Sequence, residues 1–373
     1  MTSRFRGELT VIPSVQISIR RTGVHTRIDW SSDGADRALA GAGFQVFGDS
    51  SRAGPLPTER FLIPGTRVDF GGGDVATMTS SGLSQLKELL IATHKREREI
   101  RADIRKARLQ HAISWTARAL SWGTLVSIVS KSVRASANKA VALRKAEVAT
   151  LGGNLAASRI SISFDMETAV ADPHRKMLQA FDQLAISEGS WALKTSQRID
   201  RVKARSMSST VVDRNATRLA RRTDPLVDTA DLPLSLPVQN GRATAYFYPG
   251  FVLVVDAGRS DFAIIDLREL EINYASVRFT ESESVPQDAR LVGKVWAKSN
   301  KDGSRDRRFK DNRELPVMLY GEVGLKTPTG LNEAFMFSRS EPCEAFVRAL
   351  GELKRVLAKG ASPLSAGMKA LPR

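Results

Sequence analysis

The sequence predicts an α+β protein built from a small antiparallel β-domain, a basic helical middle that resembles a hairpin or coiled coil, and a C-terminal β-barrel with a capping helix. Three observations predict this class. Apolar and polar residues alternate near both ends of the chain, the middle is rich in helix-forming charged residues, and a proline-rich stretch separates the middle from the C-terminal part. A chain of 373 residues also exceeds one ordinary core.

The first part, residues 1–78, is expected to be the small β-domain. Val15, Ile17 and Ile19 alternate with polar residues, and the alternation resumes after the turn sequence Thr22-Gly23. This pattern predicts a β-hairpin.

Residues 79–222 are expected to form the helical region. Ser80 or Ser81 is placed to cap its first helix, and leucines at positions 83, 86 and 90 share one helical face. Two further helices are predicted near residues 172–188 and 190–206. Between Lys87 and Glu147 there are 14 Lys or Arg residues against 5 Asp or Glu, so this region is strongly basic.

A linker is expected at residues 223–237, because three prolines there disfavour a helix. Residues 238–362 follow as a β-module with a terminal helix from Ser340 to Gly360, and residues 363–373 as a flexible tail. About seven strands followed by one helix indicate a pleckstrin-homology-like barrel. The expected strands span about residues 244–248, 251–255, 262–266, 270–279, 291–298, 315–325 and 335–337.

Two stretches resemble a bacterial family of unknown function. RFRGELTVIPSVQISIRRTGV, with LIPGTRVDF, is similar to its short N-terminal domain, which reads Arg-Phe-Arg, a Pro-Gly-Val strand, a Ser-x-x-Gly turn and a closing Leu-Pro-Gly-Thr-Gly. Here Ser14 and Arg67 replace two of the glycines. YFYPGFVLV, VPQDARLVGKVWAKSNKDGSRDRRFKDNRELPVMLYGEV and GLNEAF resemble the C-terminal module of longer members. The resemblance implies the three-part layout and supplies no activity.

The net charge of +16 has two explanations: a generally arginine-rich proteome, which we favour, or a polyanionic partner, either nucleic acid or an anionic lipid surface. In the helical region the alternative is a solvated face whose Arg and Glu residues pair with each other. In the loop near residue 307 the alternative is pairing of its arginines with Asp306, Asp311 or Glu322. The candidate polyanion contacts are Arg98, Arg101, Arg105, Arg108, Arg307, Arg308 and Arg313.

We expect no catalytic residue, metal or cofactor. Cys343 is the only cysteine, and no histidine lies near it in sequence to act as a base. The four histidines lack zinc-ligand spacing, and no phosphate-binding loop or nucleophile elbow is present. The N-terminus has no apolar signal region, and the apolar window at 112–129 is interpreted as a buried helix or a hairpin tip.

These observations favour a cytoplasmic, non-catalytic adaptor or scaffold with a protein partner. It would bind a protein, a peptide or a lipid headgroup through the C-terminal module, and its helical region would allow self-association or peripheral membrane association. The first alternative is a protein that binds nucleic acid through its basic helices, independently of base sequence. The second alternative is a hydrolase of unrecognised type.

Overall fold

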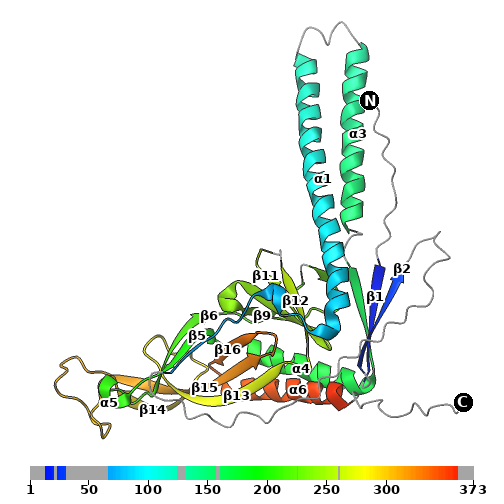
Figure 1. Ribbon diagram of the computed structural model, residues 1–373. Coiled ribbons are helices and arrows are strands. Elements are labelled where there is room, and N and C mark those ends of the chain that lie inside the picture. Colours follow the sequence, from blue (N-terminus) through cyan, green and yellow to red (C-terminus); the bar gives the residue numbers. More distant parts are fainter. Residues whose placement is uncertain are drawn as a thin grey trace, which may run out of the picture.

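The computed structural model describes residues 13–20, 23–30, 66–123, 131–156, 160–224, 226–258 and 261–359. They form a mixed structure of helices and largely antiparallel sheets, which confirms the α+β class. A long helical hairpin projects from a body that contains the sheets and two further long helices (Figure 1). The expected tail at 363–373 and residues 31–65 of the expected first domain lie outside the described residues.

The projecting hairpin, called the arm below, consists of α1 (Ser84–Gly123) and α3 (Lys131–Ala156). The first turns of α1 belong to the body, because Leu86 and Leu90 are buried in its core together with Leu83 of the preceding 3-10 turn. Ser80 does not cap this helix as expected. Its hydroxyl instead donates to the Glu269 carboxylate at 2.6 Å and accepts from the backbone N–H of Asp266 at 2.9 Å, which fixes the base of the arm to the body.

A four-stranded sheet lies beside the base of the arm, in the order β2-β1-β4-β8. Strands β1 and β2 form the hairpin that the alternating residues predict. Strand β4 pairs in parallel with β1, so the N-terminal hairpin is completed by a strand from the middle of the chain. The strands are β1 (Pro13–Arg20), β2 (Gly23–Trp30), β4 (Ile160–Met166) and β8 (Val227–Asp228).

The second sheet is a meander in the order β12-β11-β10-β9-β7. The predicted turn between β10 and β11 is present, and Gly250 adopts a φ of 125° there, a conformation that favours glycine. Nearly every side chain of β9 to β12 is buried, so this sheet forms the centre of the core. Its strands are β7 (Ala220–Arg221), β9 (Leu234–Val238), β10 (Ala243–Phe247), β11 (Phe251–Asp256) and β12 (Phe262–Asp266).

The third sheet has seven strands in the order β13-β15-β16-β5-β3, with β14 paired to β15 and β6 paired to β5. It therefore combines the C-terminal strands with strands that precede the expected linker. The strands are β3 (Arg67–Asp69), β5 (Ser190–Arg198), β6 (Thr210–Ala216), β13 (Glu271–Thr280), β14 (Arg290–Trp296), β15 (Glu314–Lys326) and β16 (Asn332–Phe337).

Helices α4 (Thr168–Ala185) and α6 (Ser340–Lys359) pack against each other, and α6 also packs on β13 and β15. Phe181 and Phe346 meet edge-on at 5.6 Å between ring centroids. Both helices bury residues at spacings of three and four, as amphipathic helices do. One continuous apolar core joins these helices, the meander sheet, β4 and the base of α1.

The structure corrects three expectations. Residues 190–206 are not a helix: β5 occupies most of them, followed by the single turn α5 (Arg201–Ala204). The C-terminal strands belong to two open sheets, and the described residues do not close into a barrel. The expected linker is docked on the body, because buried Asp224 accepts a hydrogen bond from the Tyr248 hydroxyl at 3.0 Å, and pairing of β5 with β16 crosses it.

Candidate functional site

The arm has a thin interior and a large exposed surface. Ile104 and Ala107 of α1 and Val141 of α3 are buried between the helices, together with the Glu97 side chain. A narrow apolar seam of this kind holds two helices together and leaves most side chains in solvent. None of the described helices is long and apolar enough to cross a membrane.

Two of the four predicted arginines on α1 are engaged in interactions, and the other two form no ion pair with the described residues. All four side chains are exposed, but Arg101 donates to the Glu97 carboxylate at 2.5 Å and Arg98 also takes part in an interaction. For Arg105 and Arg108, no ion pair is found with any residue that the structure describes. Arg105 and Arg108 therefore present their guanidinium groups to solvent.

Large apolar side chains are exposed toward the free end of the arm. Leu109, Ile113 and Trp115 of α1 are 64%, 59% and 58% exposed. Leu143 of α3 is also exposed. The arm therefore combines a basic surface with an apolar one, a combination that the sequence analysis did not predict.

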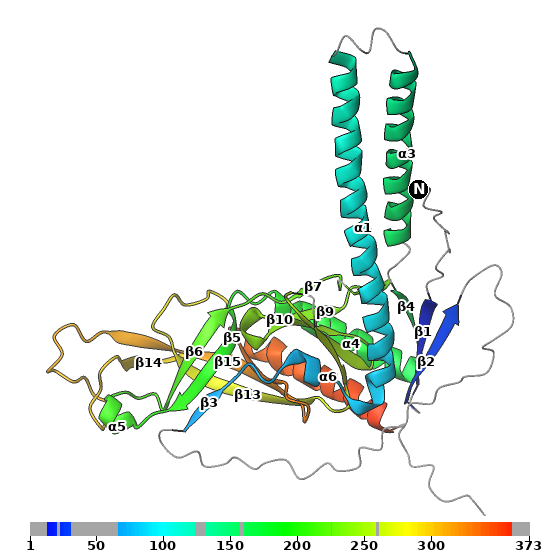
Figure 2. The ribbon, with the colours of Figure 1, turned by 45° about the horizontal axis from the view of Figure 1, so that its top comes forward.

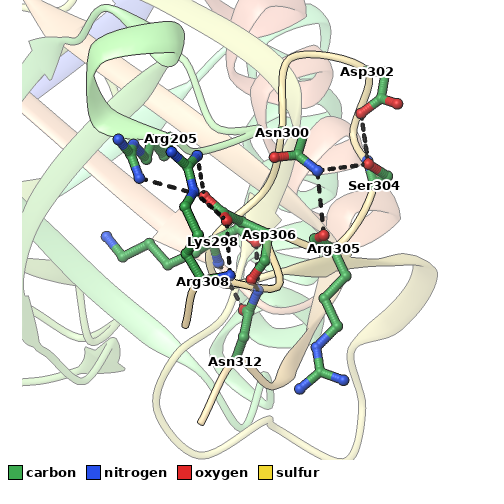
Figure 3. Close-up of polar contacts among 9 residues, drawn as sticks. All are labelled: Arg205, Lys298, Asn300, Asp302, Ser304, Arg305, Asp306, Arg308 and Asn312. Atoms are coloured by element: carbon green, nitrogen blue, oxygen red, sulfur yellow. Dashed lines mark hydrogen bonds and ion pairs between the residues drawn. The ribbon is translucent and has the colours of Figure 1, made fainter. Parts of the chain in front are cut away.

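The predicted arginine loop at residues 300–313 is held by a buried carboxylate (Figure 3). Asp306 accepts hydrogen bonds from the Arg308 guanidinium at 2.8 and 2.9 Å and lies 3.4 Å from the guanidinium of Arg205. The hydrogen bonds from Arg308 hold the pKa of the Asp306 carboxyl below its ordinary value. Asn312 spans the base of the loop through two hydrogen bonds to the backbone of Lys298.

Arg308 is therefore a structural residue, as the alternative interpretation of this loop expected. Arg307 and Arg313 are exposed, and Arg313 makes only a long contact of 3.5 Å to the Ser282 carbonyl. The loop lies at the end of the body opposite the arm, in the two ribbon views (Figures 1 and 2). The two predicted groups of arginines thus belong to separate surfaces.

A pocket of about 600 Å³ lies where three connections meet, those between α4 and β5, β6 and β7, and β13 and β14. Hydrogen bonds hold these connections together. The Glu188 carboxylate accepts from the backbone N–H of Gln287 at 2.6 Å, and the N–H of Glu188 donates to Asp288 at 2.8 Å. The pocket is lined by, among others, Ser187, Gly189, Trp191, Thr217, Arg218 and Pro286.

Two residues of this pocket have environments that sequence alone does not reveal. The Ser187 hydroxyl is buried and makes no hydrogen bond with the described residues. A Cβ atom at Gly189 would lie 2.2 Å from the Trp191 ring, so only glycine lets that ring close the pocket wall. Unsatisfied buried hydroxyls are uncommon in folded proteins, which makes Ser187 a candidate for ligand contact.

Behind the pocket, Arg214 lies between two aromatic rings. Its guanidinium is 4.0 Å from the centroid of Trp191 and 4.4 Å from that of Phe279, and it donates to the buried Glu281 carboxylate at 2.7 and 2.8 Å. The Tyr320 hydroxyl donates to the same carboxylate at 2.9 Å. This network is satisfied internally, so it supports the pocket wall and does not itself offer a binding group.

Cys343 is placed as a packing residue. It is completely buried, and a Cβ atom at the facing Gly321 would lie only 2.6 Å from the Cys343 Cβ. Burial raises the pKa of its thiol well above the ordinary range, which disfavours the nucleophilic thiolate. Within the described ranges, no three His, Cys, Asp or Glu side chains lie close enough to hold a metal ion.

No family model, no curated protein and no solved structure matches the chain. The resemblance to a bacterial family of unknown function stays a prediction.

Proposed function

We propose that this protein is a non-catalytic scaffold whose projecting arm binds a polyanionic surface. The observation that carries the proposal is the location of the charge. The segment from Lys87 to Glu147 holds a surplus of nine positive charges out of the chain's +16, and its exposed arginines stand on a hairpin clear of the body (Figure 2).

Physical chemistry supports this role for the arm. Arg105 and Arg108 are exposed to solvent, and guanidinium groups bind phosphate oxygens in a bidentate manner. A protein that neutralises several phosphates releases their counterions, so its affinity falls steeply with salt. Burial of Cys343 favours the non-catalytic role over the hydrolase alternative.

The body supports the adaptor half of the proposal. Its pocket combines the Trp191 ring with the unpaired Ser187 hydroxyl and the exposed Arg218, groups that suit a peptide or a headgroup with a carboxylate or phosphate. The pleckstrin-homology-like interpretation rests on a series of strands followed by one helix. Strands β9 to β16 and helix α6 have this order, and a relationship to pleckstrin-homology-like domains is part of the proposal.

The test is a variant in which Arg98, Arg101, Arg105 and Arg108 are all changed to Gln. We expect the wild type to bind duplex DNA or anionic vesicles at low salt, with log affinity falling by about 0.9 per phosphate contact for each unit of log salt on DNA. The variant should bind more weakly and with a smaller slope, measured by titration at two salt concentrations.

A charge-matched control changes Lys301, Arg307, Lys310 and Arg313 to Gln. These four exposed residues lie in the loop on the opposite end of the body, so their loss should leave binding through the arm nearly intact. Equal weakening of both variants would mean that net charge alone attracts the polyanion. Absence of wild-type binding at low salt would rule out the proposed role of the arm.

A further inference from the structure

The end of the body opposite the arm carries its own concentration of positive charge (Figure 1). Two segments form it, residues 200–205 around α5 and residues 298–313 between β14 and β15, and together they hold 10 Lys or Arg residues against 4 Asp or Glu. The segments are in contact, because the backbone N–H of Ser299 donates to the Arg205 carbonyl at 3.1 Å. These two segments are called the basic tip below.

Within the basic tip, one buried carboxylate orients two guanidinium groups (Figure 3). The Asp306 side chain is only 2% exposed, whereas those of Arg205 and Arg308 are 43% and 67% exposed. Arg308 binds this carboxylate through Nε and Nη2, and Arg205 through Nη1. The Nη1 of Arg308 and the Nε and Nη2 of Arg205 donate to no residue that the structure describes.

This arrangement suits an anion that arrives from solvent. It would meet two guanidinium groups that are already oriented and still have unused N–H donors, while the carboxylate between them stays hidden. Holding the loop therefore uses only part of the hydrogen-bonding capacity of Arg308.

The backbone of Arg205 indicates that its side chain has a role of its own. Arg205 ends α5 in the left-handed conformation, with φ 51° and ψ 44°, at a position where helices commonly have glycine. Among the described residues its one ion pair is the 3.4 Å contact to Asp306. A strained conformation kept for so long a contact points to a functional use of the guanidinium group.

Aromatic rings lie beside the arginines of the basic tip. Phe309 is 37% exposed, and the Arg205 guanidinium is 5.7 Å from its ring centroid. At the foot of the loop, the Arg305 guanidinium is 5.2 Å from the centroid of Trp296. Unpaired bases stack on aromatic rings and on guanidinium planes, while neighbouring cations contact the backbone phosphates. A duplex keeps its bases stacked inside, so a single strand offers both contacts and a duplex offers one.

A lipid surface fits the basic tip less well. Phe309 and Val202 are its only large apolar residues. Binding in a bilayer interface depends on a large buried apolar area, which two side chains do not provide.

We infer that the basic tip binds single-stranded nucleic acid, with Arg205 and Arg308 contacting backbone phosphates and Phe309 stacking against a base. The basic tip and the arm lie at opposite ends of the molecule (Figures 1 and 2). This inference therefore goes beyond the proposed function and does not depend on it.

The first experiment measures fluorescence anisotropy with a labelled oligothymidylate of about 15 nucleotides, long enough to cover a site of this kind. The parent protein carries Gln at positions 98, 101, 105 and 108, so that the arm does not contribute. We expect the parent to bind at low salt and Phe309→Leu to bind about fivefold or more weakly, because an aliphatic side chain cannot stack on a base. The control Trp115→Leu, which removes an exposed ring of the arm, should bind as the parent does.

The second experiment separates the Arg205 guanidinium from the fold. Glycine adopts the left-handed conformation without strain, so Arg205→Gly should keep a melting temperature close to that of the parent. It should nevertheless bind the oligonucleotide about fivefold or more weakly, because a charge-assisted phosphate contact is lost. Arg218→Gln is the matched control, since Arg218 is an exposed arginine of the body outside the basic tip.

The outcomes separate this inference from the role proposed for the arm. No binding by the parent at about 50 mM salt, or equal binding by both variants, overturns the basic tip as a site and leaves the arm untouched. If Phe309→Leu weakens binding of duplex DNA as much as binding of the single strand, the basic tip contacts phosphates alone and the single-strand assignment is wrong. Binding of the parent to phosphatidylglycerol vesicles and not to the oligonucleotide would identify a lipid surface as the ligand instead.

Discussion

Glu333 illustrates how a single buried carboxylate controls stability in this fold. It is almost completely buried on β16, and its side chain accepts a hydrogen bond from the backbone N–H of Gln239 at 2.8 Å. Burial raises its pKa from 4.5 to about 7, although that hydrogen bond and the charge of Arg242 act in the opposite direction. The folded protein therefore keeps a proton that the unfolded chain releases between these two pH values.

The sign of the pH dependence follows from linkage. Stability is greatest below the unfolded pKa and falls as pH rises toward the folded pKa, because ionising the buried group becomes a cost of folding. The loss is on the order of 3 kcal/mol, from the conversion of about 1.4 kcal/mol per pKa unit. Glu333→Gln should remove this pH-dependent loss of stability. The amide oxygen of Gln can still accept the hydrogen bond from the backbone N–H of Gln239.

Urea denaturation at about pH 5 and about pH 8 tests this difference. At about pH 8 the free energy of unfolding should be larger for the variant than for the wild type. At about pH 5 the two proteins should have nearly the same free energy of unfolding. His174, whose pKa is lowered to about 4 by burial, titrates identically in both proteins and cancels in the comparison. A variant with the same pH slope as the wild type would show that Glu333 ionises without penalty.

At the scale of elements, the arginine loop depends on Asp306. Asp306→Ala removes the acceptor for the Arg308 side chain and for its backbone N–H at 3.1 Å, together with the contact to Arg205. We expect the loop to open more often and trypsin to cleave it several-fold faster, after Arg305 or Arg307, as measured by mass spectrometry of timed digests.

Asp311→Ala serves as the control, because Asp311 is an exposed carboxylate of the same loop. Its cleavage rate should match that of the wild type. Equal rates for the Asp306 variant would mean that the hydrogen bonds of Asn312 alone hold the loop.

The elements that the sequence predicts well are those determined by neighbouring residues. Strands β10 to β16 and helix α6 lie close to their expected bounds, because alternation and turn residues act locally. Residues 190–198 were assigned wrongly because their partners are distant: Trp191 pairs with Met336 on one side and Ala216 on the other. Tertiary pairing overrides local propensity at such a segment.

In the candidate sites too, the sequence predicts features that depend on neighbouring residues and misses those that depend on distant ones. The sequence identifies the basic arm from composition, and it anticipates that Arg308 pairs with Asp306, two residues away. It cannot place Ser187 in a pocket, or Arg214 against Glu281, because those environments are created by connections far apart in the chain. The apolar window at 112–129 contains the exposed Ile113 and Trp115, although the sequence pattern does not distinguish buried from exposed residues.

At the scale of the whole molecule, the arm and the body should be separable, whereas the C-terminal module should not. Ile104, Ala107 and Val141 pack only within the arm and are absent from the continuous core of the body. Replacing residues 100–153 by a short Gly-Ser linker should therefore leave one cooperative thermal transition and abolish polyanion binding by the arm.

A fragment of residues 234–362 provides the contrasting case. It lacks α4, β5 and β6, and so exposes Phe346 of α6 and the edge of β16. We expect it to show no cooperative transition by calorimetry. A sharp transition for this fragment would show that the C-terminal strands are a domain in their own right.

The base of α1 is fixed in the core by Leu86 and Leu90, and this has a mechanical consequence. From residue 91 onward the helix continues for roughly 50 Å at 1.5 Å per residue. The outermost proposed contact, Arg108, lies about 26 Å along this helix from residue 91, which is roughly three Debye lengths of about 8 Å each at physiological salt. A polyanion held by the arm would therefore exert only a strongly screened potential on Arg307 and Arg313, which lie at the opposite end of the body.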